Sequence, residues 1–527
     1  MKQTLSILLL TSVMFAQAQI TNLLQYKKAK RLIYLENYQE ALPILDSLSH
    51  IDDNNANLNY LLGLCYYHQQ QDRQQAIPYL EKASKNVNEK TKEDYKSDEA
   101  PMDALYYLAH AYLLDYQLDK CIQTSETLKQ KSSDVLYKDK ADRLINHAQN
   151  AQLLTKMPIQ IEINALGANI NSTEDDYSPL INADETFMVF TSRREGSTGG
   201  QLNDEGRYYE DVYSSIKDMG QWQKAVPFNN NINTTRHDAA VALSADGNDM
   251  IIYRDDYGIG NLYSSHLFSN GWSKAEKLSS NVNSKNNETH AAFSHDGQTL
   301  YFISDIDGGY GGKDIYFSNK LPNGQWGLPQ NLGIGINTKW DEDGVYIHPD
   351  GSKLYFSSEG HNSMGGYDIF YCEWLAESGW SEPKNVGYPI NTTDDDVFAV
   401  FSADGKRAYY SAQKKDGMGG FDIYMMNLMS LPERNNTIVK GPILDANGQI
   451  VLGYNLKVYN SEHQLIGQYK ANNEGIYTLV LKQGETYFLE SNDAKLINNK
   501  LEVPGNTAFY ITQLPYHIKA IANTLAK

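Results

Sequence analysis

Cysteine is scarce in this sequence, which has 527 residues and only three cysteines, Cys65, Cys121 and Cys372. Their spacing matches neither a metal site nor a redox pair, and an odd number excludes complete disulfide pairing within the chain. Because free cysteine is among the most buried residue types, we expect all three side chains to lie in the core.

Long hydrophobic runs are also missing, apart from a short one near the start. It runs from Leu5 to Phe15, follows Lys2, and leads into Ala16-Gln17-Ala18. This order is typical of a secretory signal peptide and is too short for a permanent membrane span. Residues 1–18 are therefore predicted to be cleaved, and no cysteine follows the cleavage site to carry a lipid anchor. We expect an exported protein without a direct membrane span.

Positive charge is the third shortage, because 46 Lys and Arg residues face 65 Asp and Glu residues and leave a net charge of −19. This balance argues against nucleic acid or an anionic lipid surface as the main partner. Tyrosine is abundant instead, with 38 residues beside 15 Phe and 6 Trp, as is typical of half-exposed β-sheet surfaces. The length suggests three or four domains.

Motifs of known catalytic sites are missing too. The sequence has no Gly-x-Ser-x-Gly elbow, no His-Glu-x-x-His pair, no phosphate-binding loop and no EF-hand. Five histidines in the middle of the chain follow no ligand spacing and are expected to be structural or surface residues: His266, His290, His295, His348 and His361. We therefore expect a protein that is not an enzyme and has no catalytic or cofactor-binding residues.

Residues 19–156 show the apolar spacing of helices, in pairs that repeat with a period of about 34 residues. The clearest copy places small and large residues on two successive helices: Leu62, Gly63 and Tyr66, then Ala76, Leu80 and Ala83. This pattern resembles the tetratricopeptide repeat, in which small residues let two helices approach closely. The resemblance implies a concave face that binds a peptide or partner protein. An unrelated helical bundle is the alternative.

Residues 157–431 repeat one pattern five times in fixed register. Each unit starts with an asparagine after Ile or Val: Asn171, Asn233, Asn283, Asn337 and Asn391. Five residues later stands an acid: Asp176, Asp238, Glu288, Glu342 and Asp396. The Asp of a turn, a short apolar strand, a Gly-rich loop and an Asp-Ile-Tyr motif or a variant of it follow in that order. Each unit thus predicts four short strands, with turn chemistry between the first two.

Such a unit cannot bury both faces alone, but radial repetition makes it the blade of a β-propeller. The fifth unit lacks its last strand, and Ile159–Ile163 precedes Asn171 by the interval that suits the missing strand. We predict that this segment pairs with Phe421–Met425 and closes a five-bladed ring. The sequences Ser294-His295-Asp296-Gly297 and Gly-Gly-x-Asp-Ile-Tyr resemble the TolB-type, WD40-like (PD40) propeller repeat. That resemblance is specific for the fold and weak for function.

The five acids are the candidate site, because the first strand of each propeller blade lines the central channel. Asp176, Asp238, Glu288, Glu342 and Asp396 would form a ring near one channel mouth, and the Gly-rich loops would form its rim. Repulsion within such a ring is relieved by a cation such as Ca²⁺, by water, or by a partner's Lys or Arg. Alternatively, each acid accepts hydrogen bonds from backbone amides within its own blade.

Residues 437–527 alternate like a small β-sandwich. Val439–Gly448, Leu456–Tyr459 and Asn473–Leu479 resemble the carboxypeptidase regulatory-like, transthyretin-type domain. The likeness fades over about the last 30 residues.

The order of these parts resembles a family of exported Bacteroidetes proteins, the PorE-like components of type IX secretion and gliding machinery. The resemblance implies a periplasmic scaffold that serves secretion, gliding or surface-adhesin assembly, with an outer-membrane barrel of the PorP/SprF type as partner. Members normally end in an OmpA-like peptidoglycan-binding domain. The sequence ends at Lys527 without one, so cell-wall attachment is not implied. The alternative function is a periplasmic propeller that senses a ligand or cation.

Overall fold

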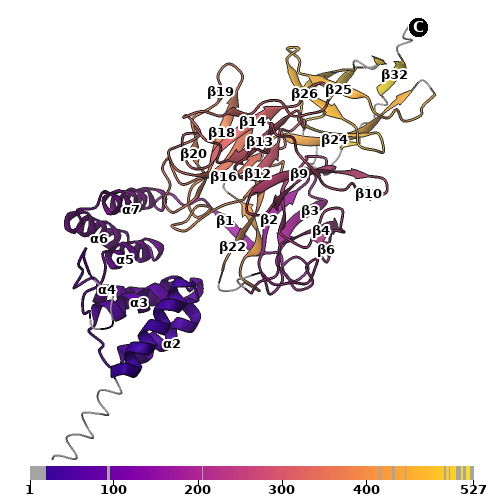
Figure 1. Ribbon diagram of the computed structural model, residues 1–527. Coiled ribbons are helices and arrows are strands. Elements are labelled where there is room, and N and C mark those ends of the chain that lie inside the picture. Colours follow the sequence, from indigo (N-terminus) through magenta and orange to yellow (C-terminus); the bar gives the residue numbers. More distant parts are fainter. Residues whose placement is uncertain are drawn as a thin grey trace, which may run out of the picture. The chain divides into compact units, whose positions relative to one another are not determined.

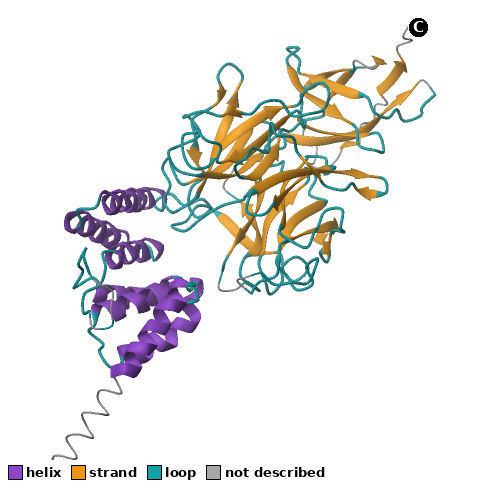
Figure 2. Cartoon of the chain, viewed as in Figure 1, coloured by secondary structure: helices purple, strands orange, loops and turns teal. Residues whose placement is uncertain are grey.

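A computed structural model gives the architecture of the chain (Figure 1). It describes residues 19–91, 95, 97–203, 206–414, 417–429, 434–445, 447–491, 494–497, 499–505, 512–513 and 518–522. The predicted signal peptide, residues 1–18, lies outside them. The chain divides into two compact units, Met1–Lys156 and Met157–Lys527. Helices make up the first unit and strands the second (Figure 2).

The first unit is built from consecutive helices that pack on one another. After helical residues 19–34 come α2 (Tyr38–Ser49), α3 (Ala56–Tyr67), the short 3₁₀ helix η1 (Gln70–Gln75), α4 (Ala76–Ala83), α5 (Asp103–Leu114), α6 (Leu118–Lys131) and α7 (Val135–Leu154). Asn37 and Asn55 cap α2 and α3 through their side-chain oxygens. A Cβ at Gly63 would lie 2.6 Å from Leu80 Cγ, so glycine allows α3 and α4 to approach. Among the described helices, none is long and apolar enough to cross a membrane.

Five antiparallel sheets of consecutive strands, here called A to E, form the larger part of the second unit. Sheet A holds β2 (Asp176–Ile181), β3 (Phe187–Ser192), β4 (Asp211–Asp218), β5 (Gln221–Trp222) and β6 (Val226–Pro227), and sheet B holds β7 (Asp238–Leu243), β8 (Asp249–Asp255), β9 (Gly260–Phe268), β10 (Gly271–Trp272) and β11 (Glu276–Lys277). Sheet C holds β12 (Glu288–Phe293), β13 (Thr299–Ser304), β14 (Asp314–Asn319) and β15 (Gln330–Asn331). Sheet D holds β16 (Glu342–Ile347), β17 (Lys353–Ser358), β18 (Asp368–Leu375), β19 (Gly379–Trp380) and β20 (Lys384–Asn385).

Sheet E contains strands from both ends of this region: β21 (Val400–Phe401), β22 (Arg407–Ala412), β23 (Asp422–Leu428) and β1 (Ile161–Ala165). Strand β1 pairs with β23 in register from Ile161 opposite Leu428 to Ala165 opposite Tyr424. The predicted pairing of the early segment with the last unit is confirmed. The paired residues are shifted from the prediction, because Ile161–Ala165 rather than Ile159–Ile163 pairs with Tyr424–Leu428 rather than Phe421–Met425. Beyond β1, Leu166 N donates to Ile423 O at 3.2 Å.

The anchor asparagines join each sheet to the one before it. Each side-chain oxygen accepts from a backbone N–H and each side-chain NH₂ donates to the C=O of the same residue, at 2.7–3.1 Å. The pairs are Asn171–Ile423, Asn233–Val212, Asn283–Leu262, Asn337–Ile315 and Asn391–Ile369. They link A to E, B to A, C to B, D to C and E to D, which is a closed cycle. The region is therefore a β-propeller.

The C-terminal part of the second unit is a pair of sheets. One contains β24 (Asn436–Asp445), β27 (Ile476–Lys482), β29 (Ala494–Ile497), β31 (Thr512–Gln513) and β32 (Ile518–Ala522), and the other contains β25 (Asn455–Tyr459), β26 (Leu465–Lys470), β28 (Thr486–Glu490) and β30 (Lys500–Glu502). Val439, Leu456, Tyr477 and Leu479 are buried among the side chains that the sheets share. These sheets form a β-sandwich, as the alternation in the sequence predicts.

The sandwich is docked on the turn end of the propeller, the end opposite to the five acids. Arg434 Nη1 donates to Asp350 Oδ2 at 2.5 Å, and Gln468 N donates to Asp296 Oδ2 at 3.0 Å. Burial by itself would raise the pKa of Asp350, but His348 and Arg434 hold that pKa well below its usual range. Lys440 pairs with Asp184 of sheet A. The turn acids therefore fix the sandwich, a role that the sequence did not reveal.

The cysteines are free and buried, as predicted. Four of the five histidines also fit the expected structural role. His295 bonds the carbonyl of Ile466 in the sandwich, His348 contacts Asp350, His266 contacts Asp249, and His361 bonds the carbonyl of Ile336.

Candidate functional site

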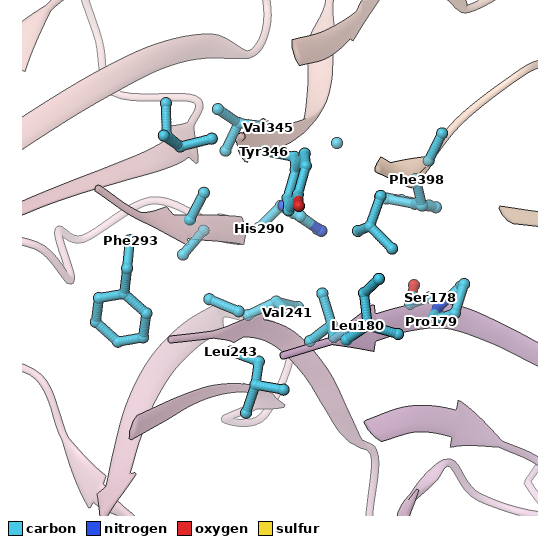
Figure 3. A pocket seen from close by; sticks show the side chains of 18 of the residues that line it. Ser178, Pro179, Leu180, Val241, Leu243, His290, Phe293, Val345, Tyr346 and Phe398 are labelled. Atoms are coloured by element: carbon cyan, nitrogen blue, oxygen red, sulfur yellow. The ribbon is translucent and has the colours of Figure 1, made fainter. Parts of the chain in front are cut away.

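The first strands of the five sheets surround a central hollow, which is the candidate site (Figure 3). Strands β2, β7, β12 and β16 line it together with residues 398–400 of sheet E. Its enclosed volume is about 40 Å³, and the value rises to about 640 Å³ only when the space open to solvent is included. Asp176, Asp238, Glu288 and Glu342 are the first residues of these four strands, and Asp396 lies four residues before β21.

Each acid is engaged within its own sheet. Its carboxylate accepts from the backbone N–H and the hydroxyl of the Ser or Thr four residues earlier, at 2.5–3.0 Å. These partners are Ser172, Thr234, Ser284, Thr338 and Thr392. The geometry corresponds to the alternative of internal hydrogen bonding. Among the described residues, no three metal-ligating side chains come close enough together to hold an ion.

Two of the three aspartates and both glutamates have a further partner. Asp176 pairs with Arg194 and Asp238 with Arg254, each at 2.5 Å. Where the sheet supplies a serine instead, a longer acid reaches it, and Ser304 and Ser358 each donate to their glutamate at 2.8 Å. The carboxylates of sheets A and B are thus neutralised by arginine, and those of sheets C and D are held by hydroxyl groups.

Burial raises the pKa of Glu342 to about 7, although Thr338 and Ser358 donate hydrogen bonds to its carboxylate. Burial also raises the pKa of Glu288 and of Asp238. Burial likewise raises the pKa of Asp396 in sheet E well above its usual value. The carboxyl groups of Glu288 and Glu342 are therefore protonated at a higher pH than exposed ones.

Replacement of Glu342 by glutamine should change how stability depends on pH. The glutamate pKa is about 4.3 in an unfolded chain and about 7 here, so the contribution of Glu342 to stability is complete below pH 4.3 and lost as the pH rises to 7. Between about pH 4.3 and 7.5 the Glu342→Gln variant should gain about 3 kcal/mol of unfolding free energy relative to the wild type. Urea unfolding across this range measures the difference. A constant difference between the two proteins would contradict the expectation.

The Gly-rich loops lie at the same mouth and pack between neighbouring sheets. Asp368 accepts from the backbone N–H of Met364 and of Gly365 at 3.0 and 3.1 Å, which fixes the loop of sheet D. A Cβ at Gly365 would lie 2.3 Å from the carbonyl oxygen of Asp394 in sheet E. The Gly-rich loop of sheet D therefore packs against the backbone of sheet E. Parts of the loops remain exposed, including Tyr257 at 87% and Tyr310 at 48%.

A cluster around Glu210 was missed by sequence reasoning. Arg193 Nη2 donates to Glu210 Oε1 at 2.9 Å, His237 Nδ1 lies 2.7 Å from Oε2, and the hydroxyl of Tyr177 also donates to this carboxylate. Burial would raise the pKa of Glu210, but His237, Arg193 and Tyr177 lower it to about 2. The cluster joins sheets A and B at the mouth. It occurs in one unit only, so the repeat gave no signal for it.

Comparisons with known proteins concern the fold. A scan of protein-family models found no match, and neither did a search of curated proteins. Among solved structures, TolB from Acinetobacter baumannii matches 49% of this chain and 55% of its own, at 17% identity and a TM-score of 0.32. The match thus spans about half of that TolB chain. A TolB protein from Agrobacterium tumefaciens, described as putative, matches 62% of this chain and 98% of its own, at 14% identity and a TM-score of 0.32.

The expectation that the chain is not an enzyme requires correction. The similar structures include a glycoside hydrolase, at 10% identity over 53% of this chain and 94% of its own with a TM-score of 0.36. They also include a gluconolactonase from Xanthomonas campestris, at 14% identity over 51% of this chain and 89% of its own with a TM-score of 0.28. Enzymes thus occur among the structures similar to this chain, so missing sequence motifs do not exclude catalysis. At such identities the likeness concerns the fold and assigns no reaction.

Proposed function

We propose that this chain is a periplasmic scaffold of the outer-membrane envelope that serves secretion, gliding or surface-adhesin assembly. In this proposal the helical unit is a tetratricopeptide-like domain, sheets A to E are the blades of a five-bladed TolB-type propeller, and the sandwich is a regulatory-like domain. The signal peptide and the order of the parts support export and resemblance to the PorE-like components. An outer-membrane protein of the PorP/SprF type is the expected partner.

One observation carries the proposal: the two ends of the propeller are used differently. The sandwich occupies the turn end through Asp184, Asp296 and Asp350. The opposite mouth presents large exposed side chains on its Gly-rich loops, among them Tyr257 and Tyr310. Aromatic side chains are enriched where proteins bind one another, because they bury much area and can also form a hydrogen bond. The mouth is therefore the surface proposed to contact the partner.

Affinity capture of the tagged, full-length chain from envelope extracts tests this function. We expect co-purification of an outer-membrane protein, and at least a tenfold loss of capture in the double variant Tyr257→Ser with Tyr310→Ser, because interface aromatics are often worth more than 1 kcal/mol each. The matched control is Leu465→Ser, which changes an exposed side chain of the sandwich. Equal capture by the double variant and the wild type would contradict binding at the mouth. Failure to enrich any outer-membrane protein would contradict the scaffold proposal itself.

A further inference from the structure

One level of the propeller channel is built from the residue two positions after each acid. These residues are Ser178, Ala240, His290, Gly344 and Phe398. The backbone there has φ values of +51° at Ser178, +59° at Gly344 and +58° at Phe398, and the pairing register of the inner strand slips beside this level in sheets A to D. Left-handed conformations of Ser and Phe are costly and tend to persist at functional sites.

The side chain of His290 is the notable polar group at this level. The residue is 5% exposed, and its Nδ1 atom finds no hydrogen-bond partner among the described residues. Its ring stacks on Phe398 from sheet E, with centroids 5.2 Å apart and planes 24° apart. A buried imidazole nitrogen without a partner is unfavourable, unless a bound molecule supplies the missing hydrogen bond.

Gly344 lies beside this stack. It lies in sheet D, between the sheets that carry His290 and Phe398, and a Cβ there would come 3.2 Å from Phe398 N and 3.4 Å from its ring. The stacked pair therefore reaches across sheet D into the channel. Figure 3 shows His290 and Phe398 facing the same hollow as Ser178, Leu180 and Val241.

The rest of the wall is mostly apolar and carries no available charge. Leu180, Val241 and Val345 contribute aliphatic surface. The nearest charged pair, Lys313 with Asp343, is closed on itself at 3.1 Å. Burial lowers the pKa of His290 to about 4, so the imidazole is neutral at physiological pH. A charged guest would lose its hydration here without gaining a partner of opposite charge.

We propose that this pocket binds a small uncharged aromatic molecule, whose ring lies against Phe398 and the aliphatic wall and whose polar group hydrogen-bonds to Nδ1 of His290. This is a small-molecule site in the channel, distinct from the protein contact proposed at the mouth. A failed test of the protein contact at the mouth would not affect the proposal of a small-molecule site. An aromatic ring matches the apolar wall and the Phe398 face, and one hydrogen bond satisfies the imidazole.

Titration of the full-length protein with phenol, benzoate and benzylamine, followed by ligand-observed NMR and calorimetry, tests the proposal. The three probes share a ring and differ in charge. We expect saturable binding of phenol at millimolar or lower concentration, and binding of the two charged probes at least tenfold weaker. A lack of saturable phenol binding, or equal binding of all three probes, would overturn the proposal.

Two variants locate the bound phenol. His290→Leu removes the nitrogen at similar volume and should weaken phenol binding about fivefold to tenfold. Phe398→Leu removes the ring face and should weaken it about threefold to tenfold. The matched controls are His50→Leu and Phe268→Leu, at exposed positions outside the lining of the hollow. Each protein is first checked for an unchanged circular dichroism spectrum. If one variant fails to fold, the other decides, and unchanged phenol affinity in a folded variant refutes the assignment.

Discussion

Replacement of Asn171 by alanine is expected to lower the free energy of unfolding of the propeller by about 2 kcal/mol, because the buried backbone N–H of Ile423 loses its partner. Its side chain accepts from Ile423 N at 2.9 Å and donates to Ile423 O at 3.1 Å. Alanine leaves the N–H of Ile423 enclosed without a hydrogen bond, while its C=O still accepts from Leu166 N at 3.2 Å. Asn171 and Ile423 are 252 positions apart and join sheet A to sheet E. The variant therefore weakens the closure of the ring.

Tryptophan fluorescence during urea unfolding measures this effect selectively. All six tryptophans lie between Trp222 and Trp380, within the propeller. The control is Asn362→Ala, at an exposed loop position, which should change the unfolding free energy by less than about 0.5 kcal/mol. If Asn171→Ala unfolds at the same urea concentration as the control, the asparagine bridges do not hold the ring together.

Replacement of Gly311 by alanine should destabilise the propeller by about 3 kcal/mol or more, because an added Cβ has no room. It would lie 2.0 Å from the carbonyl oxygen of Trp340 and 2.8 Å from that of Thr338. Both atoms are backbone and belong to the turn that donates to Glu342. Relief of the clash would have to move that turn, and with it the contact between sheets C and D.

Gly335→Ala is the matched control, because its Cβ would have nothing within 4 Å and its φ lies outside the left-handed region. Alanine there should leave stability unchanged or raise it by up to about 1 kcal/mol, since it restricts the unfolded chain. The same fluorescence measurement compares the two variants. Similar unfolding midpoints for Gly311→Ala and Gly335→Ala would show that the seam between sheets C and D is loosely packed.

The repeating part of the propeller could be predicted because its signals are local. Apolar strands, Asp-containing turns and Gly-rich loops recur in register, and each reports the backbone within a few residues of itself. The register also indicated that β1 completes sheet E. The fifth unit lacked its last strand, and an extra strand preceded the first unit. The anchor asparagines were visible as a pattern, but the residue that each bonds in the preceding sheet was not.

The role of the five acids shows where local reasoning stops. Their equivalent position at or just before the first strand of each sheet followed from the repeat. Whether the carboxylates face a shared ligand or their own turns depends on side-chain geometry over less than 3 Å. In the structure, the Ser or Thr four residues earlier donates a hydrogen bond to each carboxylate. That spacing of four was present in all five units and is the signal that would have identified a cap.

The sequence by itself determined the repeated strands, the turns between them and the alternation of the sandwich. Backbone preference and hydrophobic periodicity depend only on residues that are neighbours in the chain. Only the tertiary structure decided that Arg434 and Lys440 fasten the sandwich to turn acids, and that His290 meets Phe398 across Gly344. These contacts join segments that are distant in the chain. Their partners are selected by the curvature of the closed ring, which no single unit contains.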